Sequence, residues 1–260
     1  MMYDLQVLVE EFKLEGKLYA WQWPYCKKRY VARRLIKKAI KEGKLKRHQR
    51  IVEWSSGNLA KELCNIASIL MHPVTIVAGC DLKNKLPPWV DIIETNQLMN
   101  LAPGRVVSKK ELSDITKKLA DSKKACYLNQ LESKEHVKIY TEFAKKLIKV
   151  LPKPDAYIEH VGSGATFVGM GGELKKTYPD MQVVACSNIW GDVKHAIAFD
   201  IPFEYTMAKG NDFSKNSSKI KELLFQTGIN RHQHSMGNIC MALQWLKQNP
   251  NKTVFTTIGD

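Results

Sequence analysis

No apolar run in these 260 residues reaches the roughly 18–20 residues that a membrane-spanning helix needs. Met1–Glu15 carries acidic residues where a secretory leader would be basic and then apolar. The chain also lacks internal repeats, low-complexity segments and Gly/Ser linkers. We therefore expect a cytoplasmic protein, and its hydrophobic content of 44% is enough for a sizeable core.

Cysteines are few and dispersed, and none forms a Cys-x-x-Cys pair; the six lie at positions 26, 64, 80, 126, 186 and 240. This spacing indicates neither a zinc site nor a disulfide framework, and reduced thiols are expected. His232 and His234 form a His-x-His pair, a spacing that metal ligands sometimes use. No nearby Asp, Glu or Cys completes a ligand set, so we expect no metal and favour a structural or site-lining role for this pair.

Strand-like and helix-like segments alternate along the chain, which is typical of parallel sheets covered by helices. Beyond the segments discussed below, we expect strands at 74–78 and 92–94 and helices at 109–120 and 136–150. Leu151-Pro-Lys-Pro154 is a candidate hinge, because two prolines cannot continue a helix. The expected fold is therefore α/β, with an N-terminal lobe at 1–150 and a C-terminal lobe at 151–260.

A glycine loop stands between a strand and a helix in the second half. Asp155–Val161 is a strand candidate, Gly162-Ser-Gly-Ala-Thr166 follows it, Phe167–Lys176 is helical, and Met181–Cys186 is a second strand. Backbone N–H groups in such a loop can close on an anion, and the helix N-terminus adds partial positive charge. The loop predicts a phosphate site, although such turns also occur for purely steric reasons.

The first half contains a similar unit. Arg50–Trp54 is a strand candidate, Ser55-Ser-Gly-Asn58 is a polar turn, and Leu59–Met71 has apolar residues at helical spacing. In open α/β sheets ligands bind at the carboxyl ends of the strands, and both turns leave their strands there. The two turns together favour one shared site between two lobes.

The pair of turns resembles the fold-type-II pyridoxal-phosphate enzymes, whose best-known members are the cysteine synthases. The resemblance implies that Asn58 lies beside the cofactor ring, and that Gly162, Ser163, Gly164, Ala165 and Thr166 hold its phosphate. It implies that Ser55, Ser56 and Gly57 bind the substrate.

Further segments follow the order of that family. Gln130-Leu131 followed by Glu135-His136 and Tyr140 resembles its Gln-Phe segment and His-Tyr pair, and implies that Gln130 assists substrate binding. Ser235-Met-Gly-Asn238, opening a helix, resembles the turn whose serine contacts the pyridine nitrogen. Thr253–Asp260 resembles the strand that leads into the family's Pro-Asp-x-Gly turn. The resemblance covers nearly the whole chain.

The family holds its cofactor as a Schiff base on a lysine at the start of a helix. Tyr30–Gly43 is expected to be a helix, because Ala32, Leu35, Ile36, Ala39 and Ile40 form one apolar stripe. Counting back from Gly43, the family's lysine falls on Lys28, with Lys27 the near alternative. The preceding loop, Trp21–Lys28, is shorter than the family's and lacks its glycine, and Arg29 stands where the family has an acid.

The resemblance implies a transferase or lyase that replaces the β-substituent of an O-activated serine, as a cysteine synthase forms L-cysteine from O-acetylserine and sulfide in cysteine biosynthesis. Lys28 would also act as the general base. Dehydration and desulfhydration use the same scaffold and stay open. A homodimer is expected by resemblance.

The net charge of +14 is not explained by this family, and the segment Lys27–Arg50 contributes most of it with twelve Lys and Arg against Glu42. Such a helix can bind nucleic acid, but a lysine-rich face is more often simply solvated. The alternative to an enzyme is therefore a catalytically degenerate relative that acts as a binding or regulatory protein, through this basic segment.

Overall fold

The computed structural model describes residues 1–23, 26–55, 57–78, 82, 84–95, 98, 108–186, 199, 201–207, 212–229 and 233–258, with backbone only at 109, 212, 214 and 233–235. The described chain is mixed α/β and forms two compact units. Unit 1 comprises Met1–Cys26 and Tyr140–Asp260, and unit 2 comprises Lys27–Ile139. No helix in the described ranges is long and apolar enough to span a bilayer.

Unit 1 is built on a six-stranded sheet in the order β1-β2-β10-β7-β8-β9. Its strands are β1 (Met2–Asp4), β2 (Gly16–Gln22), β7 (Ala156–His160), β8 (Gln182–Cys186), β9 (Thr206–Met207) and β10 (Lys252–Ile258). Only β1 is antiparallel to its neighbour among these described strands. The carboxyl ends of the other five therefore lie at one edge of the sheet.

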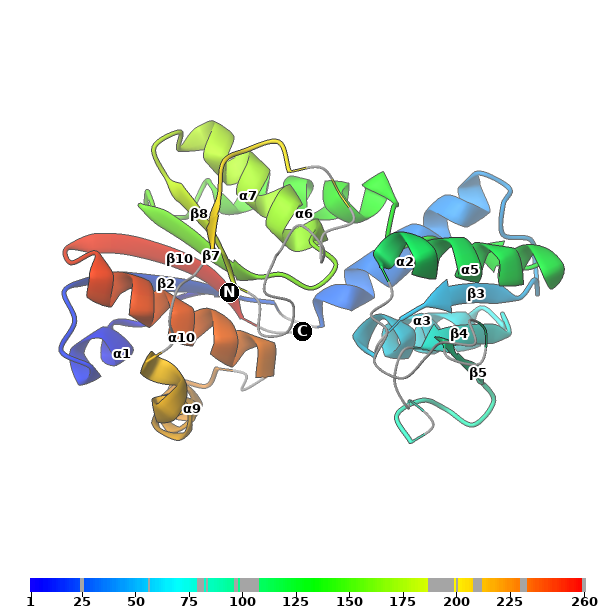
Figure 1. Ribbon diagram of the computed structural model, residues 1–260, viewed down its shortest axis with the longest axis horizontal. Coiled ribbons are helices and arrows are strands. Elements are labelled where there is room, and N and C mark those ends of the chain that lie inside the picture. Colours follow the sequence, from blue (N-terminus) through cyan, green and yellow to red (C-terminus); the bar gives the residue numbers. More distant parts are fainter. Residues whose placement is uncertain are drawn as a thin grey trace. The chain divides into compact units, whose positions relative to one another are not determined.

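Helices cover both faces of this sheet (Figure 1). They are α1 (Gln6–Glu11), α7 (Ala165–Thr177), η1 (Asp212–Asn216), α9 (Ser217–Gln226) and α10 (Gln233–Gln248). An apolar cluster joins α1, α9 and α10 to one face, where Leu18, Ile158 and Val254 are fully buried. Side chains alternate along a strand, so Phe255 points to the opposite face and stacks on Tyr157 at 5.6 Å.

Unit 2 is a four-stranded parallel sheet in the order β5-β4-β3-β6. Its elements are α2 (Lys27–Lys41), β3 (Ile51–Trp54), α3 (Asn58–Ile69), β4 (Val74–Ala78), β5 (Asp91–Glu94), α5 (Lys109–Ser122) and β6 (Cys126–Tyr127), followed by α6 (Lys134–Leu147), which continues into unit 1. The four residues of β3 are all buried because both faces of a parallel sheet are covered.

The expected α/β class with parallel sheets is confirmed, but the division of the chain differs from the expected one at residue 150. β2 pairs with β10 from Gly16 opposite Lys252 to Gln22 opposite Ile258. This long-range pairing places the first 26 residues in the same unit as the end of the chain. Leu151–Pro154, expected as a hinge, consequently lies inside unit 1.

Candidate functional site

The Gly162 loop of unit 1 joins the carboxyl end of β7 to α7. Gly164 is the N-cap residue of α7, and its φ of 87° is a left-handed conformation that residues other than glycine rarely adopt. No side chain makes a capping hydrogen bond at this helix start. A Cβ added at Gly162 would meet no atom within 4 Å, so open space lies beside this residue. The segment is thus a bare helix N-terminus with room beside it.

Several backbone N–H groups at the start of α7 are available as hydrogen-bond donors. The first N–H groups of a helix have no partner within it. Among the described residues, none accepts a hydrogen bond from the N–H groups of residues 162–167, whereas the Val168 N–H donates to the carbonyl of Gly164. Buried Thr166 and partly exposed Ser163 add hydroxyl groups to the same turn. The set of donors, together with the helix dipole, fits a phosphate group.

The start of α10 is anchored beside this loop by a residue that the sequence did not single out as functional. Asn238 is buried; its side-chain oxygen accepts a hydrogen bond from the His160 N–H at 2.6 Å, and its amide donates to the Thr257 carbonyl at 2.9 Å. It therefore ties α10 to the carboxyl ends of β7 and β10. The Ser235 side chain lies outside the described part of the structure.

The corresponding turn of unit 2 follows β3. Ser55 is buried, and its hydroxyl oxygen accepts hydrogen bonds from the N–H groups of Gly57 at 3.2 Å and Ala60 at 3.0 Å. Gly57 has a φ of 153° and a ψ of −83°, a conformation open to glycine alone, although space for a Cβ exists there. Asn58 opens α3 with a half-buried side chain that makes no hydrogen bond to a described residue. Ser56 lies outside the described residues.

Lys28, on the first turn of α2, meets a buried histidine of α6. The Lys28 Nζ lies 3.4 Å from Nε2 of His136, and Nδ1 of His136 lies 2.9 Å from the Gln130 carbonyl oxygen. A carbonyl only accepts, so Nδ1 carries the proton and Nε2 is left to accept from the Lys28 ammonium. Burial, reinforced by Lys28 and Lys27, holds the pKa of His136 well below its ordinary value, so the ring is neutral.

Gln130 connects this pair to the end of β3. Its side-chain amide donates to the Trp54 carbonyl at 2.6 Å, immediately before the Ser55 turn, and the residue is 4% exposed. The Lys28–His136 pair and the Ser55 turn are therefore held in one hydrogen-bonded frame within unit 2.

A carboxyl group is buried on β3, two residues before Ser55. Glu53, fully buried on β3, accepts hydrogen bonds from the N–H groups of Trp54 at 3.0 Å and Gln130 at 3.4 Å. Burial raises its pKa from 4.5 to about 8, because the backbone donors offset only part of the desolvation. Its one sequence signal was a charge inside the otherwise apolar Ile51–Trp54.

Arg29, which departs from the family's pattern, has an acidic partner on the neighbouring helix. Its Nε lies 2.8 Å from a carboxylate oxygen of Glu62, whose side chain is 7% exposed. Glu62 lies one turn after Asn58 on α3. The ion pair therefore fixes the first turn of α2, and Lys28 with it, beside the first turns of α3.

The structure thus gathers the predicted residues in two groups, one in each unit. Lys27, Lys28, Ser55, Gly57, Asn58 and Gln130 belong to unit 2, and Gly162, Ser163, Gly164, Ala165 and Thr166 to unit 1. Of the His-x-His pair, His232 and the His234 side chain lie outside the described residues. In the described ranges no group of three His, Cys, Asp or Glu residues could hold a metal ion.

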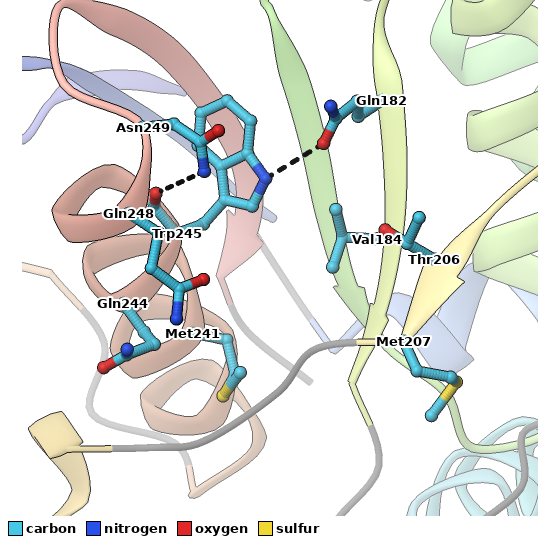
Figure 2. Close-up of a pocket in the computed structure, with 9 residues that line it drawn as sticks. All are labelled: Gln182, Val184, Thr206, Met207, Met241, Gln244, Trp245, Gln248 and Asn249. Carbon is cyan, nitrogen blue, oxygen red and sulfur yellow. Dashed lines mark hydrogen bonds between the residues drawn. The ribbon is translucent and has the colours of Figure 1, made fainter.

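A pocket of about 240 Å³ lies in unit 1, at the edge of the sheet opposite the Gly162 loop (Figure 2). It is lined by Gln182, Val184, Thr206, Met207, Met241, Gln244, Trp245, Gln248 and Asn249. Gln182 begins β8, and Gln248 ends α10, so the pocket is near the amino ends of the strands. Ligands of parallel sheets bind at the carboxyl ends, where the Gly162 loop lies.

The fold is that of an α/β protein whose two polar glycine turns follow the carboxyl ends of parallel strands. The sequence matches the family described as "Pyridoxal-phosphate dependent enzyme" over residues 27–217, and the chain belongs to that family. Its cofactor is pyridoxal 5'-phosphate. The N–H groups at the start of α7, which no described residue accepts from, fit the phosphate of this cofactor. No curated protein sequence matches the chain.

Solved structures share the fold at low sequence identity. An O-ureido-L-serine synthase is 17% identical with a TM-score of 0.76, covering 100% of this chain and 88% of that chain. An O-acetylserine dependent cystathionine beta-synthase from Helicobacter pylori is 16% identical with a TM-score of 0.76, covering 100% and 91%. An O-acetylserine sulfhydrylase isoform 3 from Entamoeba histolytica is 19% identical with a TM-score of 0.74, covering 100% and 85%. The likeness establishes a fold-type-II enzyme fold.

Proposed function

We propose that this enzyme replaces the β-substituent of an O-activated serine, and that it forms L-cysteine from O-acetylserine and sulfide. The observation that carries the proposal is the hydrogen bond between Lys28 and neutral His136 beside the Ser55 turn. Support also comes from the solved structures of similar fold, two of whose names include O-acetylserine. Cysteine is the product expected from the resemblance to cysteine synthases.

The chain's own residues would divide the work between binding and proton transfer. When bound, pyridoxal phosphate withdraws electrons from the substrate's α-carbon. Residues 162–166 would hold its phosphate with their backbone N–H groups, and Ser235 would contact its ring nitrogen. Lys28 would carry it and, once released, take the proton from the substrate's Cα at Nζ.

The substrate would be bound by the turn of unit 2. Ser55 orients the Gly57 and Ala60 N–H groups, and the amide of Asn58 is available to the substrate or the cofactor ring. Ser56 and Gln130 are the further substrate contacts that we propose. His136 would accept from Lys28 and so aim its Nζ, because the Gln130 carbonyl fixes the tautomer.

The test begins with a visible absorbance spectrum of the purified protein with added pyridoxal phosphate. Borohydride reduction and peptide mapping then locate the labelled lysine, and product analysis follows with O-acetylserine and sulfide. A band, a label on Lys28 and cysteine formation support the proposal. A label on Lys27 moves the catalytic assignment to that residue, and pyruvate without cysteine indicates elimination instead of replacement.

The second candidate is a relative that has kept the fold and lost the chemistry. It is favoured by Arg29, which stands where the family has an acid and is engaged with Glu62. The absence of both a band and a labelled lysine would establish this candidate and reject the enzyme. The homodimer and the cytoplasmic location stay predictions, and sedimentation of the purified protein tests the first.

A further inference from the structure

The segment Lys27–Arg50 has twelve Lys and Arg residues. Apart from Lys27 and Lys28, they form two groups that differ in whether an acidic side chain contacts them. Five contact acids: Arg29 pairs with Glu62, Arg34 and Lys38 with Glu135, Lys44 with Glu42, and Arg50 with Asp91. The other five are exposed, and no described acid lies within ion-pair distance of them: Arg33, Lys37, Lys41, Lys46 and Arg47. We call this second set the basic stripe.

The members of the basic stripe lie on α2 and in the segment directly after it. Arg33, Lys37 and Lys41 are four residues apart, so at 1.5 Å per residue they recur about every 6 Å along one side of the helix. Lys46 and Arg47 are exposed in the segment that follows the helix. Glu42, the acid of this segment, is already engaged by Lys44 and Lys38, which lower its pKa.

The charge is confined to the unit that carries the stripe. Unit 2 has 24 Lys and Arg against 11 Asp and Glu, whereas unit 1 has 16 against 15. A surface evolved only for solubility would intersperse both signs. An excess on one unit, arranged in a row, instead creates a positive field that attracts a linear polyanion.

Two other occupants are disfavoured by the packing of α2. Val31, Ala32, Leu35, Ile36 and Ala39 are buried in unit 2, so the apolar face of the helix is not available to enter a lipid surface. A second copy of the chain carries the same net charge of +14 and would be repelled from the stripe.

We propose that the basic stripe, Arg33, Lys37, Lys41, Lys46 and Arg47, binds the phosphate backbone of a nucleic acid. Contacts to phosphate carry no sequence information, so we expect this binding to be independent of sequence. The inference does not rest on the proposed reaction, because none of these five residues belongs to the catalytic or cofactor-binding set.

The experiment measures fluorescence anisotropy of a labelled single-stranded RNA and of a duplex DNA, each titrated with the full chain at several salt concentrations. Five phosphate contacts predict a slope of log K against log salt of about −3.5 for the single strand and about −4.5 for the duplex. The triple variant Arg33→Gln, Lys37→Gln, Lys41→Gln should weaken binding and reduce the slope by about 2 or about 3, respectively.

A matched control removes the same charge from another helix of unit 2. Lys110, Lys117 and Lys118 of α5 are exposed and have no ion pair to a described acid, so their triple substitution by Gln should leave the slope nearly unchanged. Circular dichroism checks that both variants fold. Equal losses in the two variants, no binding by the parent chain, or binding to phosphatidylserine vesicles but to neither nucleic acid would each overturn the proposal.

Discussion

The Nζ of Lys28 lies 3.4 Å from Nε2 of His136, although the two residues are separated by 108 positions in the chain. The His136 ring is fully buried and donates from Nδ1 to the Gln130 carbonyl, so the lone pair of Nε2 is directed at the lysine. This contact distinguishes Lys28 from the exposed lysines of the same helix. It is also the basis of the first two predictions.

Replacing Lys28 by Ala should abolish turnover, by about 10³-fold or more, because both the cofactor attachment and the general base are lost. The Lys27→Ala variant is the matched control and should keep the visible band of the bound cofactor. The measurement is the absorbance spectrum and the rate of cysteine formation for both variants. Full activity in the Lys28 variant would reject the assignment.

The second prediction concerns His136, measured with the cofactor at a limiting concentration. Replacing His136 by Phe should lower about tenfold the fraction of Lys28 that is labelled by the cofactor after borohydride reduction. The ring volume is kept, but the acceptor for the Lys28 ammonium is lost. His136→Gln restores an acceptor oxygen and should recover part of the labelling. Unchanged labelling in a folded His136→Phe protein would show that the histidine serves packing alone and does not position Lys28.

Replacing Glu53 by Gln should remove a pH dependence of stability. The folded protein keeps this proton up to about pH 8, whereas the ordinary pKa is 4.5, so unfolding releases a proton between these values. The free energy of unfolding should therefore fall as pH rises from 5 to 8, by at most about 1.4 kcal/mol for each pH unit.

The neutral amide of the Glu53→Gln variant has no such proton to release, so its free energy of unfolding lacks this pH dependence; its altered hydrogen bonds add only an offset that is the same at every pH. Urea denaturation of parent and variant at pH 5, 6.5 and 8 measures the difference between them. The variant's stability relative to the parent should increase steadily over this series. Parallel curves would mean that Glu53 is already ionised at the lowest pH.

Replacing Gly16 by Ala should destabilise unit 1 by about 2–5 kcal/mol. Its φ is 126°, and an added Cβ would come within 2.4 Å of the Lys252 carbonyl oxygen and 2.9 Å of Leu246 Cδ2. Gly228→Ala is the matched control, since its φ is 74° and its surroundings are open, and it should cost only about 1–2 kcal/mol. Thermal unfolding midpoints compare the two; equal shifts would contradict the steric explanation.

Local sequence patterns predicted much of the central chain well. The helix expected at Leu59–Met71 is Asn58–Ile69, and the strand expected at 74–78 is Val74–Ala78, because apolar periodicity reports burial over a few consecutive residues. The helix expected to start at Tyr30 begins three residues earlier, at Lys27. The apolar pattern did not reveal this first turn because Lys27 and Lys28 are not apolar. β1, α1 and β2 were not predicted.

Long-range relationships were not accessible from those patterns. The sequence placed Asn58 and the Gly162 loop in the expected strand-turn-helix settings, but carried no sign that Asn238 ties α10 to two strand ends. It also marked Lys27–Arg50 as basic without separating paired from outward cations. That separation depends on Glu62, Asp91 and Glu135, which lie on other elements.

The sequence by itself determined the α/β class, the glycine turns and the family, because each depends on residues that are adjacent in the chain and act through local backbone conformation. Only the tertiary structure decided that residues 1–26 join the sheet of the C-terminal half, and that Lys28 meets a neutral His136. Both depend on strand pairing and burial between distant segments. Such contacts are selected by the free energy of the whole fold and leave no periodic signal in either segment.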